Sequence, residues 1–181
     1  MGLLSNIFGK KQNDKTKPDL VFYEKIIELI VVSDTLKETL KTNLKQAFED
    51  PKSFYDDNDE FILSDRGLTY TNDSLQTSKF VLIDIMQDNG EMTEIDWKES
   101  ESEIRIYMNE IRIAKNYDFA ITYDDLYGEL DTDEILKLIN EKELKPQGYS
   151  IVILDIGSDS YIFTIVPSKD EKEVFEMFEK L

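Results

Sequence analysis

Two apolar runs rich in β-branched residues lie between Gly148 and Pro167, and they constrain the fold more than any other stretch. The runs Ser150–Ile156 and Tyr161–Val166 are separated by the polar segment Gly157–Ser160. Gly and Asp in so short a gap are typical of a hairpin turn, because Gly readily adopts the positive φ angles that such turns need. Pro167 ends the second strand, since it has no N–H group to donate to a β-ladder. The sequence therefore predicts a β-hairpin near the C-terminus.

Capping residues and apolar periodicity predict the other elements of the chain. A helix is predicted behind Ser168 and Glu171, whose spacing matches a capping box, and another behind Ser100 and Glu103 for the same reason. Apolar residues at helical spacing predict further helices. The predicted helices cover 19–32, 35–49, 75–87, 101–115, 131–143 and 169–180, and strands are predicted near 92–97 and 118–122. These elements favour an α+β fold, in which a small mixed or antiparallel sheet is packed with about five to six helices.

Length and charge divide the chain into a short tail and one domain. The chain has 181 residues, which suits a single hydrophobic core. Residues 1–18 carry four lysines and one aspartate, a net charge of +3, so we expect a flexible basic tail followed by one α+β domain over residues 19–181.

The tail begins with the apolar run Gly2–Phe8, which is too short to span a membrane. As a helix followed by Lys10 and Lys11, this run would at most rest on an anionic membrane surface. The alternative is a tail that is disordered or whose structure depends on packing. No stable membrane anchor is therefore expected.

The residue types that are absent exclude several classes of catalytic site. The chain contains neither cysteine nor histidine. It therefore has no disulfides, no thiolate–metal sites and no catalysis by a serine–histidine or cysteine–histidine pair. It also contains no glycine-rich phosphate loop and no G-x-S-x-G nucleophile motif. Hard, oxygen-ligated cations are the metals that remain, so Ca²⁺ or Mg²⁺ is the cofactor class left open, and no other cofactor is expected.

The net charge of −18 restricts the class of partner. Because the tail carries +3, the remaining residues carry −21. Such a surface repels phosphate backbones, so we expect no nucleic-acid partner. It suits a basic protein or divalent cations, and the alternative is that the charge serves only solubility in the cytoplasm.

Several short motifs in the second half of the chain resemble those of a known family. They are Asp96–Glu99 (D-W-K-E), Asn116–Phe119, Tyr123–Asp125, Gly148–Ser150 and Leu154–Tyr161, which contains G-S-D-S-Y, with Val166-Pro167 beyond them. Together they resemble a family of small acidic bacterial proteins that is described only as a domain of unknown function. The resemblance covers Ile95 to the C-terminus. It implies a bacterial, cytoplasmic protein and assigns no catalytic residue.

The turn of the predicted hairpin is the first candidate site. It offers two carboxylates and two hydroxyls, from Asp155, Ser158, Asp159 and Ser160. Such a set suits a divalent cation or a hydroxyl-rich ligand, and Asp96, Asp124 and Asp125 would join it if they lie beside the turn. Paired carboxylates also perform acid–base catalysis. The alternative is structural, because Asp and Ser side chains bond to nearby backbone groups in turns.

Aromatic residues beside carboxylates form the second candidate site. Tyr123 and Tyr127 lie in one predicted loop with Asp124 and Asp125, and Trp97 is the only tryptophan. Aromatic and acidic side chains together bind Lys and Arg through cation–π and ion-pair contacts. The alternative is that the rings cover the edge of the core, with Trp97 as an anchor beneath the turn that follows it.

These observations support three hypotheses, and the function itself is unknown from sequence. The first is a non-enzymatic cytoplasmic protein-interaction module whose acidic surface binds a basic protein, by analogy an accessory or immunity-type inhibitor. The alternative is a carboxylate-based, divalent-cation-dependent hydrolase or ligand-binding domain centred on the hairpin turn, with Asp155, Asp159 and Asp124. The third is a structural subunit that forms a homo-oligomer through the hairpin edge or the apolar helix Asp19–Val32.

Overall fold

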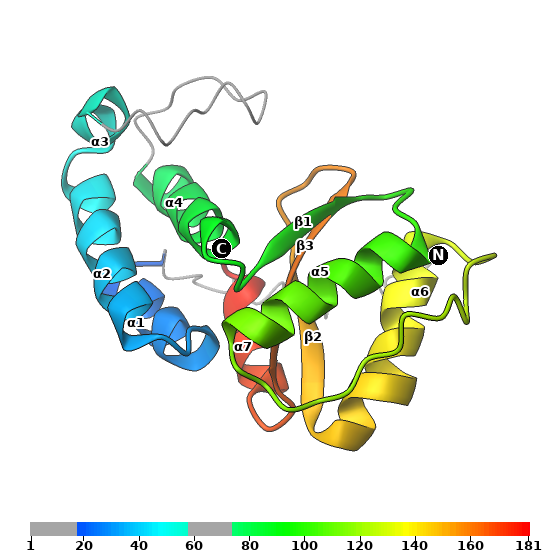
Figure 1. Cartoon of the computed structure of the whole chain (residues 1–181). Helices are drawn as coiled ribbons and strands as arrows, with labels where there is room; N and C mark the ends of the chain where they lie inside the picture. Colours follow the sequence, from blue (N-terminus) through cyan, green and yellow to red (C-terminus); the bar gives the residue numbers. More distant parts are fainter. Residues whose placement is uncertain (1–17, 58–73) are drawn as a thin grey trace, which may run out of the picture.

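A three-stranded antiparallel sheet lies between two groups of helices in the computed structural model, which describes residues 18–57 and 74–181 (Figure 1). The predicted tail falls outside these residues, apart from Pro18. The helices are α1 (Leu20–Ile30), α2 (Asp34–Glu49), α3 (Pro51–Asp57), α4 (Ser74–Asp88), α5 (Glu101–Ala114), α6 (Thr132–Ile139) and α7 (Glu171–Phe178). The strands are β1 (Thr93–Asp96), β2 (Tyr149–Leu154) and β3 (Ser160–Pro167). The predicted α+β class is confirmed.

The predicted hairpin forms, and its second strand becomes the centre of the sheet. The strand order is β1-β3-β2, and both pairs are antiparallel. Strands β2 and β3 pair from Tyr149 opposite Pro167 to Leu154 opposite Ile162. Strand β1 pairs with the first half of β3, where Asp96 lies opposite Ser160. The hairpin turn therefore lies beside the end of β1.

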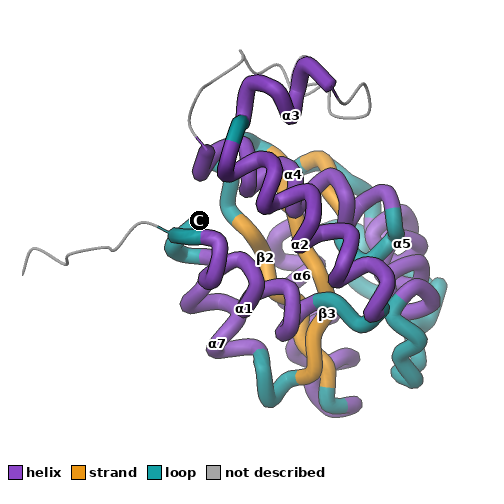
Figure 2. The backbone as a smooth tube through the Cα atoms, turned by 90° about the vertical axis from the view of Figure 1, so that its left-hand side faces the viewer, coloured by secondary structure: helices purple, strands orange, loops and turns teal. Residues whose placement is uncertain are grey.

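Both faces of the sheet are buried, which explains the nearly continuous apolar sequence of β3. Ile162 and Val166 belong to the core formed with α1, α2, α4 and α7, whereas Phe163 and Ile165 belong to the core formed with α5 and α6. Figure 2 shows α1, α2, α4 and α7 grouped in front of the strands. Successive side chains of a strand point to opposite faces, so a sheet covered on both faces needs apolar residues in both sets. The exception is the buried Thr164, whose hydroxyl donates to the carbonyl of Glu91 at 2.7 Å.

The apolar helix predicted from Asp19 to Val32 corresponds to α1. Asp19 caps it, because its Oδ1 accepts a hydrogen bond from the N–H of Phe22 at 2.9 Å. The buried face of α1 consists of Tyr23, Ile26, Ile27 and Ile30. Helix α3 directly follows α2 and was not predicted. Among the described helices, none is long and apolar enough to cross a membrane.

A buried lysine and glutamate join α1 to the far end of α5. Lys115 follows α5, and its Nζ donates to the carbonyl of Ile30 and lies 4.0 Å from Oε2 of Glu91. The same Glu91 oxygen accepts a hydrogen bond from the N–H of Val32 at 3.2 Å. Both side chains are almost completely buried. Removal of Lys115 would therefore leave the Glu91 carboxylate in the interior without its lysine partner.

The predicted strand 118–122 is wrong, because these residues form no strand. Their backbone bonds to a side chain instead: Gln147 accepts from the N–H of Ala120 at 2.8 Å and donates to its carbonyl at 2.9 Å. The amide of Gln147 thus makes the two hydrogen bonds that a neighbouring strand would make. Phe119 is buried in the core with α5 and α6, so the segment has the apolar pattern of a strand without its pairing.

Replacing Gln147 by Ala is expected to lower the free energy of unfolding by about 1 kcal/mol, because water replaces its exposed bonds to Ala120 only in part. Urea denaturation measures the loss. Gln46→Ala, at an exposed position of α2, is the control and should change stability by less than about 0.5 kcal/mol. Equal losses in the two variants would contradict the role given to Gln147.

The two predicted capping boxes have different outcomes. Ser100 caps α5 as predicted, since its Oγ accepts from the N–H of Glu103 at 3.3 Å. Ser168 does not cap α7, which begins at Glu171 after Asp170. The Oγ of Ser168 lies 2.8 Å from the Oγ of Ser150 instead. A hydroxyl contact with Ser150 of β2 has therefore replaced the predicted local cap.

The chain between α6 and β2 covers part of the outer edge of the sheet. Helix α6 ends at Ile139 and continues as a π-helix over Asn140–Leu144 and a 3-10 helix over Lys145–Gln147. The Oδ1 of Asn140 accepts from the N–H of Ile151 at 2.8 Å. The edge of β2 is thus occupied at Ile151 by a side chain.

Candidate functional site

Trp97 stands at the exposed apex of a tight turn between β1 and α5. Oδ1 of Asp96 accepts from the N–H of Lys98 at 2.8 Å, and the Asp96 carbonyl accepts from the N–H of Glu99 at 3.0 Å. Trp97 is 48% exposed, and the ammonium of Lys98 lies 4.2 Å from the centroid of its ring. The ring therefore already holds one cation on its face, at a distance typical of a cation–π contact.

The loop of residues 123–130 has no regular secondary structure, yet a buried carboxylate holds its backbone. The N–H groups of Leu126 and Tyr127 both donate to the side chain of Glu101, at the start of α5. Glu101 is only 2% exposed. Two backbone donors aimed at one buried carboxylate fix the course of the loop, since each such bond is charge-assisted.

Arg105 completes this support by joining Glu101 to Glu143. Its guanidinium donates to Oε1 of Glu101 at 2.6 and 2.8 Å, and to the two oxygens of Glu143 at 2.8 and 2.9 Å. A further bond of 3.3 Å reaches the carbonyl of Thr122. Arg105 and Glu101 are buried and Glu143 is half-buried, so this triad of charges reaches from the interior to the edge of the surface. We call Glu101, Arg105 and Glu143 the buried triad.

The pKa values of Glu101 and Arg105 show that both groups favour the charged state. Burial raises the pKa of Glu101, but hydrogen bonds from Tyr127, Leu126 and Arg105 lower it more, so the net shift is downward. Burial lowers the pKa of Arg105, and Glu143 and Glu101 together raise it above its ordinary value. Glu101 and Arg105 therefore support the loop as ions rather than as neutral groups.

A shallow pocket of about 310 Å³ lies between the Trp97 turn and the supported loop. It is lined by Trp97, Lys98, Glu99, Ser100, Glu101, Asp125, Gly128, Leu130, Asp131, Thr132 and Ile135, and we call it the acidic pocket. The hydroxyl of Thr132 donates to the carbonyl of Trp97 at 2.7 Å, which ties the start of α6 to the turn. The pocket thus joins β1, α5, the loop and α6.

The surface around the acidic pocket is both apolar and acidic. Tyr123, Leu126 and Leu130 are 61%, 56% and 41% exposed. The stretch from Tyr123 to Glu134 contains six carboxylates and neither lysine nor arginine. Tyr127 differs from Tyr123, because it is half-buried with its ring 5.8 Å from Cζ of Arg105. Trp97 and Asp125 therefore share the pocket, Tyr123 and Asp124 are exposed on the loop, and Tyr127 covers the buried triad.

Comparison with protein families shows which family the sequence of this chain matches. Residues 22–181 match the family described as "Domain of unknown function (DUF6630)". The chain belongs to this family. The DUF6630 match starts within α1, so it extends well beyond the motifs from Ile95 onward and includes the N-terminal helices. No curated protein and no solved structure matches the chain.

The hairpin turn of this DUF6630 domain makes its hydrogen bonds largely within itself. Asp155 accepts from the N–H of Gly157 at 2.7 Å, and the hydroxyls of Ser158 and Ser160 lie 2.7 Å apart. Ser160 also donates to Glu94 of β1 at 2.6 Å. Asp159 is exposed in the same turn. Within residues 18–57 and 74–181, no group of three or more acidic side chains is arranged to hold a metal ion.

Sequence reasoning did not identify the residues that support the DUF6630 pocket, namely Glu101, Arg105, Thr132 and Glu143. Glu101 and Arg105 are four residues apart, a spacing that usually indicates an exposed ion pair on a helix. The sequence did contain a signal for a buried Arg105, because this residue shares the helical face of Ile104, Met108 and Ile111, which are buried. An arginine on an apolar face predicts a buried partner.

Proposed function

We propose that this protein is a non-enzymatic protein-interaction module of the cytoplasm, and that it binds a basic segment of another protein at the acidic pocket. The observation that carries the proposal is the display of Trp97 and Leu130 beside Asp125 and Asp131 in one pocket. Aromatic anchors with a charged rim are typical of binding surfaces.

The support beneath the acidic pocket favours binding over a merely solvated surface. An irregular loop with several exposed apolar side chains needs no internal scaffold to stay in water. Here the backbone N–H groups of the loop donate to the ionised carboxylate of Glu101, which in turn accepts hydrogen bonds from Arg105. Rigid presentation lowers the entropy lost on binding, so the buried triad prepares the loop for a partner.

The contact between Lys98 and Trp97 supports a cation–π mode of binding for the proposed partner. The Lys98 ammonium lies 4.2 Å from the ring centroid. A lysine or arginine of a partner would bind the Trp97 ring in the same manner and pair with Asp125 or Asp131. Apolar groups beside that cation would contact Leu130 and Leu126. The expected partner segment therefore alternates basic and apolar residues.

The only tryptophan of the chain makes the proposal directly testable. Titration with a short Trp-free peptide of alternating Arg and Leu is expected to change Trp97 fluorescence in a saturable way. In the Asp125→Asn/Asp131→Asn variant the affinity should fall about fivefold, because two exposed ion pairs are lost. The dependence on salt should weaken as well.

A charge-matched variant separates site binding from attraction to the acidic surface as a whole. Glu38→Gln/Glu49→Gln removes the same two charges from exposed positions on α2 and should leave the affinity nearly unchanged. A peptide of alternating Glu and Leu should not bind. Equal weakening by the two double variants would sink the proposal, as would a fluorescence response to the acidic peptide.

A further inference from the structure

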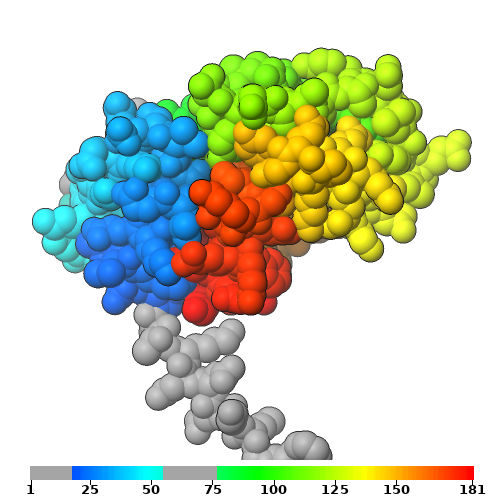
Figure 3. Space-filling model, turned by 90° about the horizontal axis from the view of Figure 1, so that it is seen from below, coloured from blue at the N-terminus to red at the C-terminus, as the bar shows by residue number. Residues whose placement is uncertain are grey.

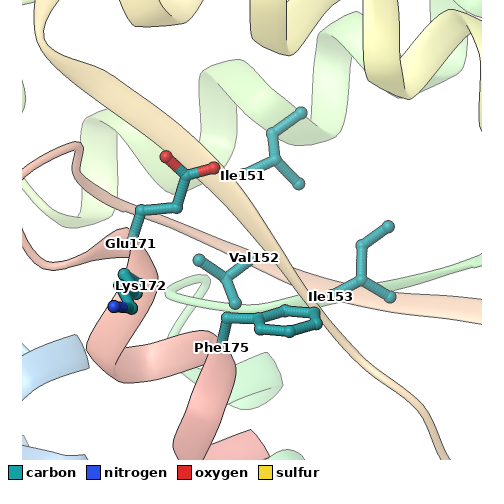
Figure 4. A pocket seen from close by; sticks show the side chains of 6 residues that line it. All are labelled: Ile151, Val152, Ile153, Glu171, Lys172 and Phe175. Carbon is teal, nitrogen blue, oxygen red and sulfur yellow. The ribbon is translucent and has the colours of Figure 1, made fainter. Parts of the chain in front are cut away.

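An apolar groove of about 370 Å³ runs along the outer edge of β2, beside α7. It is lined by Ile151, Val152, Ile153, Glu171, Lys172 and Phe175. Figure 4 shows Val152 and Phe175 on one side of the strand, and Ile151 and Ile153 on the other. Phe175 is 52% exposed and Ile153 is 38% exposed. The edge of the sheet is therefore apolar on both of its faces.

Next to this groove the backbone of β2 is open to a further strand at Ile153, beyond the part of the edge that Asn140 occupies. The N–H of Ile151 bonds to Asn140, so it points away from β3. Residues two apart in a strand point their backbone groups to the same side, so the N–H and C=O of Ile153 also point outward. Among the hydrogen bonds of the described residues, none satisfies these groups of Ile153. An unpaired edge of this kind readily accepts an added strand.

The N-terminal end of the described chain lies close to α7. The ammonium of Lys180 lies 5.7 Å from the ring centroid of Phe22, and Lys25 pairs with Glu173. Figure 3 shows α7 in red on the surface between the blue N-terminal helices and the orange segment that contains β2. Seventeen residues precede Pro18, and the nine from Gly9 to Lys17 span up to about 30 Å when extended.

We propose that the N-terminal segment Gly2–Phe8 binds this groove as an added strand along the outer edge of β2. In an extended segment Leu4 and Phe8 share one face, and Leu3 and Ile7 share the other. Apolar residues on both faces match an edge that is apolar on both faces. The tail carries +3 and the rest of the chain −21, so electrostatic attraction favours the same contact.

Disulfide trapping tests the proposal without interference, because the chain has no cysteine of its own. The Asn6→Cys/Lys172→Cys variant places one thiol in the segment and one at the rim of the groove. The control is Asn6→Cys/Val21→Cys, since Val21 is 69% exposed and much closer to the tail along the chain. A tail without a binding site would close the shorter loop faster. Docking should instead make the Lys172 pair form its disulfide roughly tenfold faster or more.

A second change shows whether the apolar side chains direct the segment. Leu4→Ser/Phe8→Ser in the Lys172 pair should remove its advantage, and in the Val21 pair it should have no effect. The expected product is a monomer on a non-reducing gel. A faster reaction of the Val21 pair would overturn the proposal, as would an advantage that survives Leu4→Ser/Phe8→Ser. A product formed only between two chains would overturn it too, by showing that a second copy fills the groove.

Discussion

Replacing Arg105 by Met is expected to lower the free energy of unfolding by about 3–5 kcal/mol, because it leaves the carboxylates of Glu101 and Glu143 without their cation. Glu101 is almost completely buried, so water does not compensate for the lost guanidinium. Met preserves most of the volume of the side chain, and the loss is therefore electrostatic rather than a cavity effect. This is the largest single effect that we expect from a substitution beneath the candidate site.

Urea denaturation at neutral pH measures this loss, and Arg112→Met is the matched control on the same helix. Arg112 is only partly buried and bonds to Asn109 of its own helix, so its loss should stay below about 1 kcal/mol. The Arg105→Met variant should also show lower anisotropy of the Trp97 fluorescence, because the loop beside it loosens. A loss for Arg105→Met as small as that of the control would mean that the buried triad does not stabilise the fold.

The stability of the protein is expected to rise by roughly 3 kcal/mol between about pH 7 and pH 9.5, owing to Lys115. Burial lowers the pKa of Lys115 from 10.5 to about 7, although the charge of Glu91 opposes this shift. Above pH 7 the folded protein has therefore lost the proton that the unfolded chain keeps up to pH 10.5. Because the unfolded state binds more protons in this range, stability increases with pH by up to about 1.4 kcal/mol per pH unit.

Urea denaturation at several pH values and constant ionic strength tests this dependence. The Lys115→Met/Glu91→Gln variant removes the titrating group without leaving an unpaired buried carboxylate, and its stability should stay nearly constant over the same range. The test ends below about pH 10, where tyrosines ionise in the unfolded chain. Burial raises the pKa of Tyr117, so stability falls again above that point. A rise of the same size in the double variant would show that Lys115 is not its source.

Local signals in the sequence predicted the fold well wherever structure depends on neighbouring residues. The hairpin, the cap at Ser100 and most helices follow from turn residues and apolar periodicity. The prediction of a strand at 118–122 was wrong because the apolar pattern there reflects the burial of Phe119. The backbone of this segment bonds to the side chain of Gln147, which lies far along the chain, and not to another strand. The prediction that Ser168 caps α7 was wrong because its hydroxyl contacts that of Ser150 on the neighbouring strand β2 instead.

The candidate site was predictable only at its surface. Trp97, Tyr123, Asp124 and Asp125 are visible as an aromatic and acidic group in the sequence, and the structure places Trp97 and Asp125 in one pocket. The residues that fix the position of Trp97 and of the loop come from segments that are distant in the sequence. The bonds of Arg105 to Glu143 and of Thr132 to Trp97 span 38 and 35 residues, so no local pattern reveals them.

The central place of β3 has a consequence for how the protein is made. During synthesis β3, the strand that pairs with both others, emerges late. Phe163 follows its β1 partner Thr93 by 70 residues (163 minus 93). Until β3 has been synthesised, β1 has no partner strand and the apolar faces of the helices around it stay exposed. Exposed apolar surfaces of this kind attract chaperones or other nascent chains. We expect the domain to fold only after the ribosome has released most of its C-terminal end. A premature stop codon before β3 should therefore yield an insoluble product rather than a smaller folded one.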